Sequence, residues 1–253
     1  MKPVTLYQFE ISHFSEKVRF LLDYKSIPFI RKDVNYGAGQ KVVQRLTGQR
    51  QVPVIVDPNN GDRVIHDSTA IAFYLEEQYP DPPIIPKDPL RRADTLLLED
   101  WLDTALGVVA RKLFIWRMKG DNDFVRKTME MNADDLTKKL FPIMSPLLMA
   151  ILMKRDGIND RTVAEARGVT DRALDALETR LEAAPYLTGE TPTLADFTAA
   201  GTAMLLQLPP HGYLRFPADL AHEGVPEVQA AHKRFFEWKD RMYEKFRKKP
   251  GDA

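Results

Sequence analysis

The sequence predicts an α/β N-terminal domain followed by an all-α C-terminal domain. Up to residue 80, short β-rich runs alternate with segments of helical spacing, whereas beyond residue 90 almost no period-two alternation remains. Between these parts, residues 81–89 read DPPIIPKDP, with four prolines in nine residues, which suits an extended linker. We therefore expect domains at 1–80 and 90–253, joined by a linker at 81–89.

The N-terminal segments alternate between strand and helix. Residues 4–9 (VTLYQF) are rich in β-formers, and 15–26 carries an apolar helical stripe that includes Val18 and Leu21. The remaining segments are a strand at 28–34, a short helix within 35–48, strands at 52–57 and 63–67 around the turn PNNG, and a helix at 68–80 capped by Asp67 or Ser68. This β-α-β-α-β-β-α order fits a thioredoxin-like sheet whose first two strands run parallel.

The C-terminal part predicts helices only. Helical spacing is present in 90–118, 122–153, 160–184, 193–208 and 226–248. Thr193 and Asp196 form a hydroxyl-x-x-acid pattern ahead of an apolar run, which predicts a capping box. We expect Asp196 to stabilise a helix start and not to act as a catalytic acid.

Composition excludes several kinds of function. The 253 residues contain no cysteine, so disulfides, thiolate metal sites and a protein thiol nucleophile are excluded. Lys plus Arg and Asp plus Glu both number 36, and this balance gives no reason to expect a nucleic-acid partner. The five histidines have no metal-ligand spacing, so we expect no metal. The longest apolar run, 143–153, is too short to span a bilayer and no signal-peptide pattern opens the chain, so we expect a cytoplasmic protein with no membrane partner.

Two serines precede the first predicted helix at the spacing of a redox C-x-x-C motif. In SHFS, Ser12 and Ser15 are three residues apart. A hydroxyl at the first position can donate a hydrogen bond to a sulfur atom, and the helix N-terminus behind it adds unpaired N–H groups and positive potential. Serine before a helix is also a common cap. Both interpretations apply to these two residues.

Four stretches, taken in order, resemble the glutathione transferases over nearly the whole chain. SHFSEKVRFLL resembles the first-helix motif of the serine and cysteine classes, and QVPVIVD the strand that bears the family's cis-proline. DSTAIAFYLEEQYP resembles the helix start that closes the glutathione site, and YLTGETPTLADFTAAG the capping motif of the buried C-terminal helix. The resemblance implies a transferase of alkyl or aryl groups with a role in detoxification, and glutathione as its co-substrate.

The resemblance gives the two serines different roles. A free thiol has a pKa near 8.5 and is mostly protonated at neutral pH, so the enzyme must favour the thiolate. Ser12 is expected to donate a hydrogen bond to this sulfur, and Ser15 to cap the helix. Ser15 and Tyr7 remain alternative thiolate stabilisers, although Tyr7 is more simply a strand residue packed against the sheet.

The resemblance also implies how glutathione is held. A cis peptide at Val52–Pro53 would turn the Val52 N–H and C=O toward the cysteinyl backbone. Asp67 and Ser68 are expected to bind the γ-glutamyl end, with Ser68 on its carboxylate and Asp67 on its ammonium. Lys41 and Gln51 are candidates for the glycine carboxylate. Both Asp67 and Ser68 also suit simple helix capping.

The electrophile pocket is expected against the first helices of the C-terminal domain, with Phe14, Arg111 and Trp116 as wall candidates by resemblance. Six of the nine methionines lie between residues 118 and 153. Methionine suits variable apolar ligands, but these residues fit ordinary helix core equally well. We expect an apolar electrophile as the second substrate.

Two alternative functions remain open on the same fold. One is a non-catalytic protein that binds an apolar ligand, and the other is an interaction module with a vestigial glutathione site. An intact site at Ser12, Val52–Pro53 and Asp67–Ser68 argues for glutathione binding but does not separate binding from turnover. By resemblance to the family, we expect a homodimer.

Overall fold

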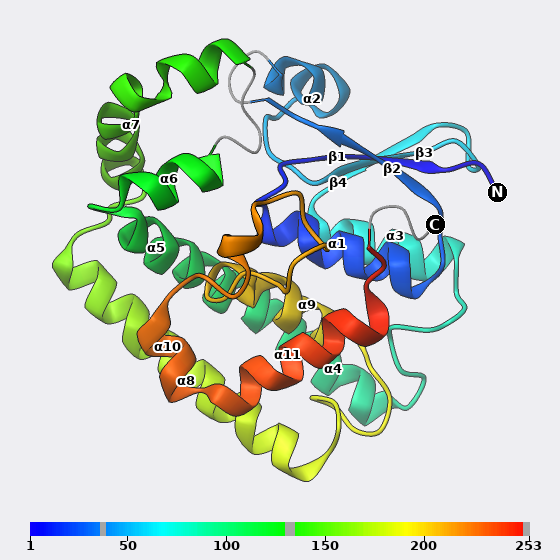
Figure 1. The fold of residues 1–253 in the computed structure, drawn as a ribbon. Coiled ribbons are helices and arrows are strands. Elements are labelled where there is room, and N and C mark those ends of the chain that lie inside the picture. Colours follow the sequence, from blue (N-terminus) through cyan, green and yellow to red (C-terminus); the bar gives the residue numbers. More distant parts are fainter. Residues whose placement is uncertain (36–38, 130–134, 250–253) are drawn as a thin grey trace.

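The computed structural model describes residues 1–35, 39–129 and 135–249, and Figure 1 shows their arrangement. The N-terminal elements are β1 (Val4–Gln8), α1 (His13–Tyr24), β2 (Phe29–Asp33), α2 (Gln40–Thr47), β3 (Val54–Asp57), β4 (Arg63–His66) and α3 (Ser68–Gln78). This is the predicted order of elements. The helix expected at 15–26 begins two residues earlier, because Ser12 is its N-cap.

A four-stranded mixed sheet forms the N-terminal half, with strand order β2-β1-β3-β4. β1 runs parallel to β2, and α1 is the crossover between them. β3 is antiparallel to both β1 and β4, so that Val54 pairs with Tyr7 on one side and with His66 on the other. The predicted thioredoxin-like fold class is therefore confirmed. α1 and α3 lie on the same side of the sheet (Figure 1).

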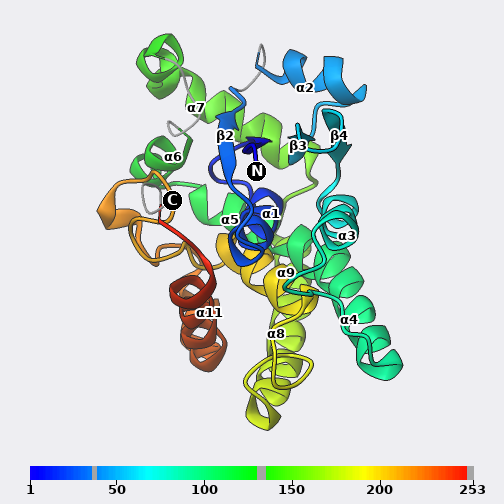
Figure 2. The same ribbon diagram turned by 90° about the vertical axis from the view of Figure 1, so that its right-hand side faces the viewer.

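Helices make up the second half, which lies below and beside the sheet in Figure 2. They are α4 (Pro89–Trp101), a π-helical segment (Leu102–Leu106), α5 (Gly107–Met118), α6 (Asn122–Met129), α7 (Asp135–Arg155), α8 (Asp160–Ala183), α9 (Leu194–Thr202), 3₁₀ turns at Ala203–Leu205 and Ala218–Leu220, α10 (Pro226–Ala231) and α11 (Lys233–Phe246). Among the described residues, no helix is both long and apolar enough to cross a bilayer.

Four predicted helical segments differ in detail from the observed ones. The segment expected at 122–153 contains two helices, α6 and α7. The helix expected at 90–118 contains a π-helical turn, a feature that often marks functional positions. The one expected at 193–208 is α-helical only to Thr202. The one expected at 226–248 divides into α10 and α11 at His232, whose φ of −122° and ψ of 49° are not helical.

The buried helix α9 joins the two halves of the molecule. Every residue of α9 is buried, and its start has the predicted capping box. The carboxylate of Asp196 accepts hydrogen bonds from the N–H groups of Thr193 and Leu187, each at 2.8 Å. Farther along α9, Gly201 lies against α1 so closely that an added Cβ would be 2.7 Å from the backbone nitrogen of Lys17. The contact between the halves therefore requires glycine at this position.

We expect Gly201→Ala to destabilise the protein by about 1–3 kcal/mol or more, because the new methyl group meets backbone atoms that cannot move independently. Gly168→Ala in α8 is the matched control. Its added Cβ would meet only the flexible end of Arg172 at 3.3 Å, so it should raise stability by about 0.5–1 kcal/mol. Urea unfolding measures both, and equal effects of the two substitutions would contradict the proposed close packing.

Candidate functional site

Ser12 lies in the turn that leads from β1 into α1. Its Oγ accepts a hydrogen bond from the Ser15 N–H at 3.2 Å, and its own N–H donates to the Phe9 carbonyl at 3.1 Å. The side chain is half-buried. Because Ser12 is the N-cap, its hydroxyl lies where the unpaired N–H groups of α1 point, at the positive end of the helix dipole.

The capping role expected of Ser15 was wrong, since Ser12 performs it. Ser15 is the third residue of α1, is 0% exposed, and its Oγ has no hydrogen-bond partner within the described part of the chain. A fully buried hydroxyl cannot contact a ligand that arrives from solvent. Tyr7 packs against a small apolar cluster of Val34, Val43 of α2 and Val54 of β3, as expected for a strand residue.

A fully buried guanidinium, that of Arg19 in α1, supports the Ser12 turn from inside. One of its Nη atoms donates to the carbonyl of Glu10 at 3.0 Å and contacts that of Ser12 at 3.4 Å. The other donates to the Gln8 side chain at 2.9 Å. Its Nε lies 2.5 Å from the Glu16 carboxylate. Arg19 thus ties the end of β1, the turn and α1 together, although its sequence context gave no sign of this role.

The C-terminal end of the described chain joins the same group. Arg247, which follows α11, binds Glu16 through Nε at 2.9 Å and also forms an ion pair with Asp23. Burial by itself would raise the pKa of Glu16, but the guanidinium groups of Arg19 and Arg247 hold it at about 2. Glu16 is therefore ionised in the folded protein at neutral pH, between two cations.

Strand register brings the other predicted glutathione residues to the same edge of the sheet. The Val52–Pro53 peptide is cis, as the resemblance implied. Because Tyr7 pairs with Val54 and Val54 with His66, this peptide and the Asp67–Ser68 helix start both lie beside the end of β1 that leads to Ser12. Three segments separated by many residues in the chain thus converge.

Asp67 caps the start of α3, which is one of the two roles predicted for it. Asp67 has a positive φ of 74°, and its carboxylate caps α3 by accepting from the N–H groups of Thr69 and Ala70 at 3.0 and 2.9 Å. The capping role left open for Asp67 is therefore confirmed. Ser68 is almost fully buried, and its hydroxyl donates to the Asp103 carboxylate at 3.4 Å.

A buried ammonium group completes this corner, and the sequence gave no indication of it. Lys17 is 0% exposed, and its Nζ lies 2.5 Å from Glu99, 2.9 Å from Asp103 and 3.0 Å from the Thr69 hydroxyl. It connects α1 and α3 to the helical half. Asp103 belongs to the π-helical segment, and its carboxylate contacts both Lys17 and Ser68.

Lys41 and Gln51 stand apart from these contacts. Both are exposed; Lys41 is in the first turn of α2 and Gln51 in the loop before β3. The backbone of Gln51 bonds to the neighbouring Gln49 side chain. Their role at the glycine carboxylate stays a prediction.

Two of the residues expected in the wall of the electrophile pocket, Phe14 and Arg111, lie near the start of α1. The Phe14 ring packs where Gly107 opens α5, since an added Cβ at Gly107 would be 3.1 Å from it. His13 is buried with its ring centroid 4.1 Å from that of Phe14. Burial, with the charge of nearby Arg111 acting in the same direction, lowers the pKa of His13 to about 3. His13 is therefore neutral at physiological pH and carries no proton for catalysis.

Trp116 points away from Arg111, because five residues correspond to about 140° of rotation along α5. Its ring is covered by the Lys119 ammonium at 4.2 Å from the centroid. Beyond it, α5 and α7 enclose a cavity of about 270 Å³ with Met118, Met149 and Met153 in its wall. Three of the six methionines in this segment thus line this cavity. The predicted methionines at 129 and 131 fall outside the described side chains.

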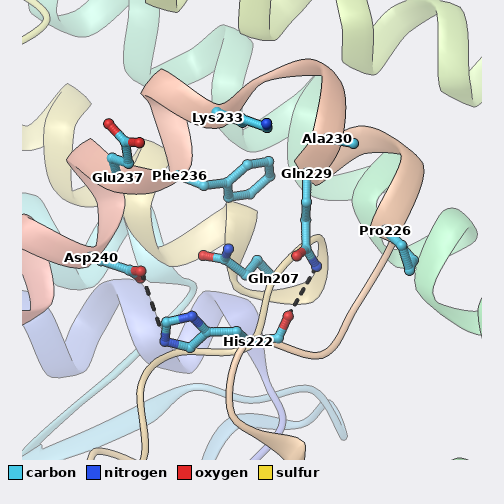
Figure 3. Close-up of a pocket in the computed structure, with 9 residues that line it drawn as sticks. All are labelled: Gln207, His222, Pro226, Gln229, Ala230, Lys233, Phe236, Glu237 and Asp240. Atoms are coloured by element: carbon cyan, nitrogen blue, oxygen red, sulfur yellow. Dashed lines mark hydrogen bonds and ion pairs between the residues drawn. The ribbon is translucent and has the colours of Figure 1, made fainter.

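A larger cavity, of about 440 Å³, lies between α10, α11 and the loop that follows α9 (Figure 3). Gln207, which is 7% exposed, forms part of its floor with Phe236, and His222 pairs with Asp240 at 3.8 Å. The residues in its wall all lie beyond position 206, so it is separate from the Ser12 turn.

Comparison with known proteins decides the family. Models of the glutathione S-transferase N-terminal and C-terminal domains match residues 6–83 and 160–241, which together are more than half of the chain. The protein belongs to the glutathione S-transferase family. Both matches agree with the mixed sheet and helical half described above.

The names of the similar proteins point to different functions. FtsZ-localized protein A of Caulobacter vibrioides is 26% identical over 78% of this chain and 74% of its own length. Glutathione S-transferase 1 of Dianthus caryophyllus is 38% identical, but over 35% of this chain and 40% of its own length. The fold is shared with a glutathione S-transferase of Methylobacterium radiotolerans solved with glutathione sulfonate, at a TM-score of 0.64, 19% identity, and coverage of 96% and 92% of the two chains.

Replacing the central carboxylate of the buried group, as in Glu16→Gln, should destabilise the protein by about 3–5 kcal/mol at neutral pH, because Arg19 and Arg247 would lose their shared counter-charge. In the wild type the Glu16 pKa is depressed from 4.5 to about 2, so its contribution is present above pH 4.5 and is lost as the pH falls toward 2. The variant should show a correspondingly weaker acid dependence. Urea unfolding from pH 7 to pH 3 measures this, with the exposed Glu77→Gln as control; matching curves for the two variants would contradict it.

Proposed function

We propose that this protein binds glutathione and that Ser12 stabilises its thiolate for attack on an apolar electrophile. The observation that supports this most directly is the hydrogen-bonding state of the Ser12 hydroxyl. Its oxygen accepts from the Ser15 N–H at 3.2 Å. A serine hydroxyl has one hydrogen and two lone pairs, so accepting this bond leaves the hydrogen available for a sulfur anion.

The position of Ser12 adds to the effect of that hydrogen. The bond from Ser15 polarises the hydroxyl, and the N-terminus of α1 adds positive potential at the same place. Each unit by which the thiol pKa falls requires about 1.36 kcal/mol of preferential thiolate stabilisation. One charge-assisted hydrogen bond contributes about 1.5–3 kcal/mol, enough to lower the thiol pKa by one or two units.

The rest of the tripeptide extends along the edge of the sheet from Ser12. The backbone of Val52 pairs with the cysteinyl residue, and the γ-glutamyl end meets the α3 start, where its carboxylate faces the helix N–H groups. Its ammonium meets the Asp67 carboxylate. The Asp103 carboxylate, which accepts a hydrogen bond from Ser68, is a second partner for this ammonium. Lys41 and Gln51 remain candidates for the glycine carboxylate.

The electrophile enters from the helical side, where Phe14 and Arg111 border the start of α1. Arg111 forms a partly exposed ion pair with Asp156 at 2.9 Å. Trp116 remains a candidate farther along α5. The cytoplasmic location expected from the sequence remains a prediction.

A second candidate function is a non-catalytic interaction protein. It is favoured by one observation: the similarity to FtsZ-localized protein A spans 78% of this chain, far more than the similarity to the plant transferase. The two functions differ in what glutathione does. A transferase is retained on a column of immobilised glutathione and converts at least one electrophile or peroxide of a test panel. An interaction protein with a vestigial site does neither.

Ser12→Ala should raise the pKa of bound glutathione and lower turnover at neutral pH by roughly tenfold to a hundredfold, because one hydrogen bond to a charged group is lost. It should also cost about 1 kcal/mol of stability, since Ser12 caps α1. Glutathione affinity should change much less. Ultraviolet titration of the bound thiolate and steady-state conjugation rates measure these effects.

Two control variants separate the roles. Ser12→Thr keeps both the cap and the donor, so it should retain most activity. Ser15→Ala removes a buried hydroxyl without a hydrogen-bond partner in the described chain, so it should leave the rate unchanged and the stability equal or higher. An unchanged thiol pKa in Ser12→Ala would count against the proposed role, and absence of glutathione retention in the wild type would favour the interaction function.

A homodimer is part of this proposal, and exposed apolar side chains support it. Leu90 and Leu97 on α4 are 81% and 73% exposed. Trp101 follows them at helical spacing, so all three occupy one face of α4. Phe73 on α3 is also exposed, and both helices lie on the same side of the molecule in Figure 2. Apolar side chains gathered on one side are typical of an interface between subunits.

Light scattering should therefore give about twice the subunit mass of 28.9 kDa at micromolar concentration. Leu97→Glu should shift the protein toward the monomer, because a dimer would bury the new charge. Leu147→Glu is the control, since Leu147 is 67% exposed on α7. A wild-type mass of one subunit, or identical behaviour of both variants, would contradict the proposed interface.

A further inference from the structure

A buried histidine faces three carboxylates where α8 meets the junction of α10 and α11. His232 is 4% exposed. Asp171, Asp175 and Glu178 are spaced by four and three residues on α8, so they share one face of that helix. α8 and α11 pack against each other in this region. None of these residues takes part in the site around Ser12.

The two ring nitrogens of His232 have different surroundings. Nε2 lies 3.3 Å from Asp171, within hydrogen-bond reach. Nδ1 lies 3.6 Å from both Asp175 and Glu178, and it has no hydrogen-bond partner in the described part of the chain. Ionised Asp171 is an acceptor, so Nε2 must donate to it. In the neutral ring, the Nδ1 lone pair then points toward two further acceptors. A buried lone pair that faces two carboxylates is suited to a cation bound between them.

We propose that Asp175, Glu178 and Nδ1 of His232 form a zinc site that links α8 to α11. Zinc bonds of about 2.0–2.1 Å to nitrogen and oxygen place neighbouring ligand atoms of a tetrahedron roughly 3.4 Å apart. The two Nδ1–carboxylate separations of 3.6 Å are close to this value, and all three ligand atoms lie within 4.8 Å of one another. One imidazole and two carboxylates form a three-ligand zinc set, and water supplies the fourth ligand.

The surrounding contacts hold these ligands in place. The His232 N–H donates to the Val228 carbonyl at 3.0 Å, which fixes the backbone at the end of α10. Glu178 accepts the Phe235 N–H at 2.9 Å through its other oxygen, Oε1. Asp171 orients the imidazole from the opposite side, as carboxylates commonly do for zinc-bound histidines. It is itself held by Arg167 at 3.0 Å.

Zinc here would have a structural consequence at the other end of α11. By fixing the first turn of that helix to α8, it would position the segment that carries Arg247 to the buried Glu16. The site does not depend on the proposed transferase function, because none of its ligands contacts the Ser12 turn.

The test is titration of metal-free, untagged full-length protein with zinc chloride by calorimetry. We expect one saturable site per subunit. At about 100 times the dissociation constant, zinc should raise the melting temperature by about 5–10 °C. Asp175→Asn and His232→Gln should each weaken binding at least tenfold. Asp175 is 71% exposed, so its variant should fold even if replacement of the buried histidine perturbs the helix junction.

His222→Gln is the matched control, because His222 also lies beside a carboxylate, that of Asp240, but outside the cluster (Figure 3). It should bind zinc as the wild type does. The proposal is overturned if the wild type shows no saturable zinc binding, or if Asp175→Asn binds with wild-type affinity.

Discussion

The buried guanidinium of Arg19 is the group on which the geometry of the Ser12 turn depends. It contacts the carbonyls of Glu10 and Ser12 and pairs with Glu16, and Arg247 binds Glu16 from the C-terminal end. A charge of this kind is tolerated in the interior only when counter-charges and hydrogen bonds surround it. The turn that presents Ser12 is thus held by residues more than two hundred positions apart in the chain.

The same principle joins the two halves at the α3 start. Lys17 has no exposed surface, and its ammonium is shared between Glu99 and Asp103 of the helical half and Thr69 of the N-terminal half. The close approach of Gly201 to Lys17 lets this geometry form. The geometry of the α3 start therefore depends on both halves, and substitutions in α4 or α9 should alter it.

Family membership leaves the activity open, because function belongs to the site and not to the fold. This chain is similar over most of its length to a protein named for localisation with FtsZ, and over a shorter segment to a plant transferase. Its Ser12 hydroxyl accepts one hydrogen bond at the start of α1, and a methionine-lined cavity adjoins α5.

Local patterns in the sequence determined the order of strands and helices, the proline-rich linker, the capping box of Thr193 and Asp196, and the motif around Ser12, because each depends on neighbouring residues. Only the tertiary structure decided which serine is the cap and which carboxylate meets Lys17. Only it brought His232 to Glu178, 54 residues earlier. Such pairs depend on how helices that are distant in the chain pack against each other. A buried charged residue, moreover, does not produce a periodic pattern in the sequence from which its burial could be predicted. The sequence therefore specified the elements and one side of the site, and packing between the two halves specified the rest.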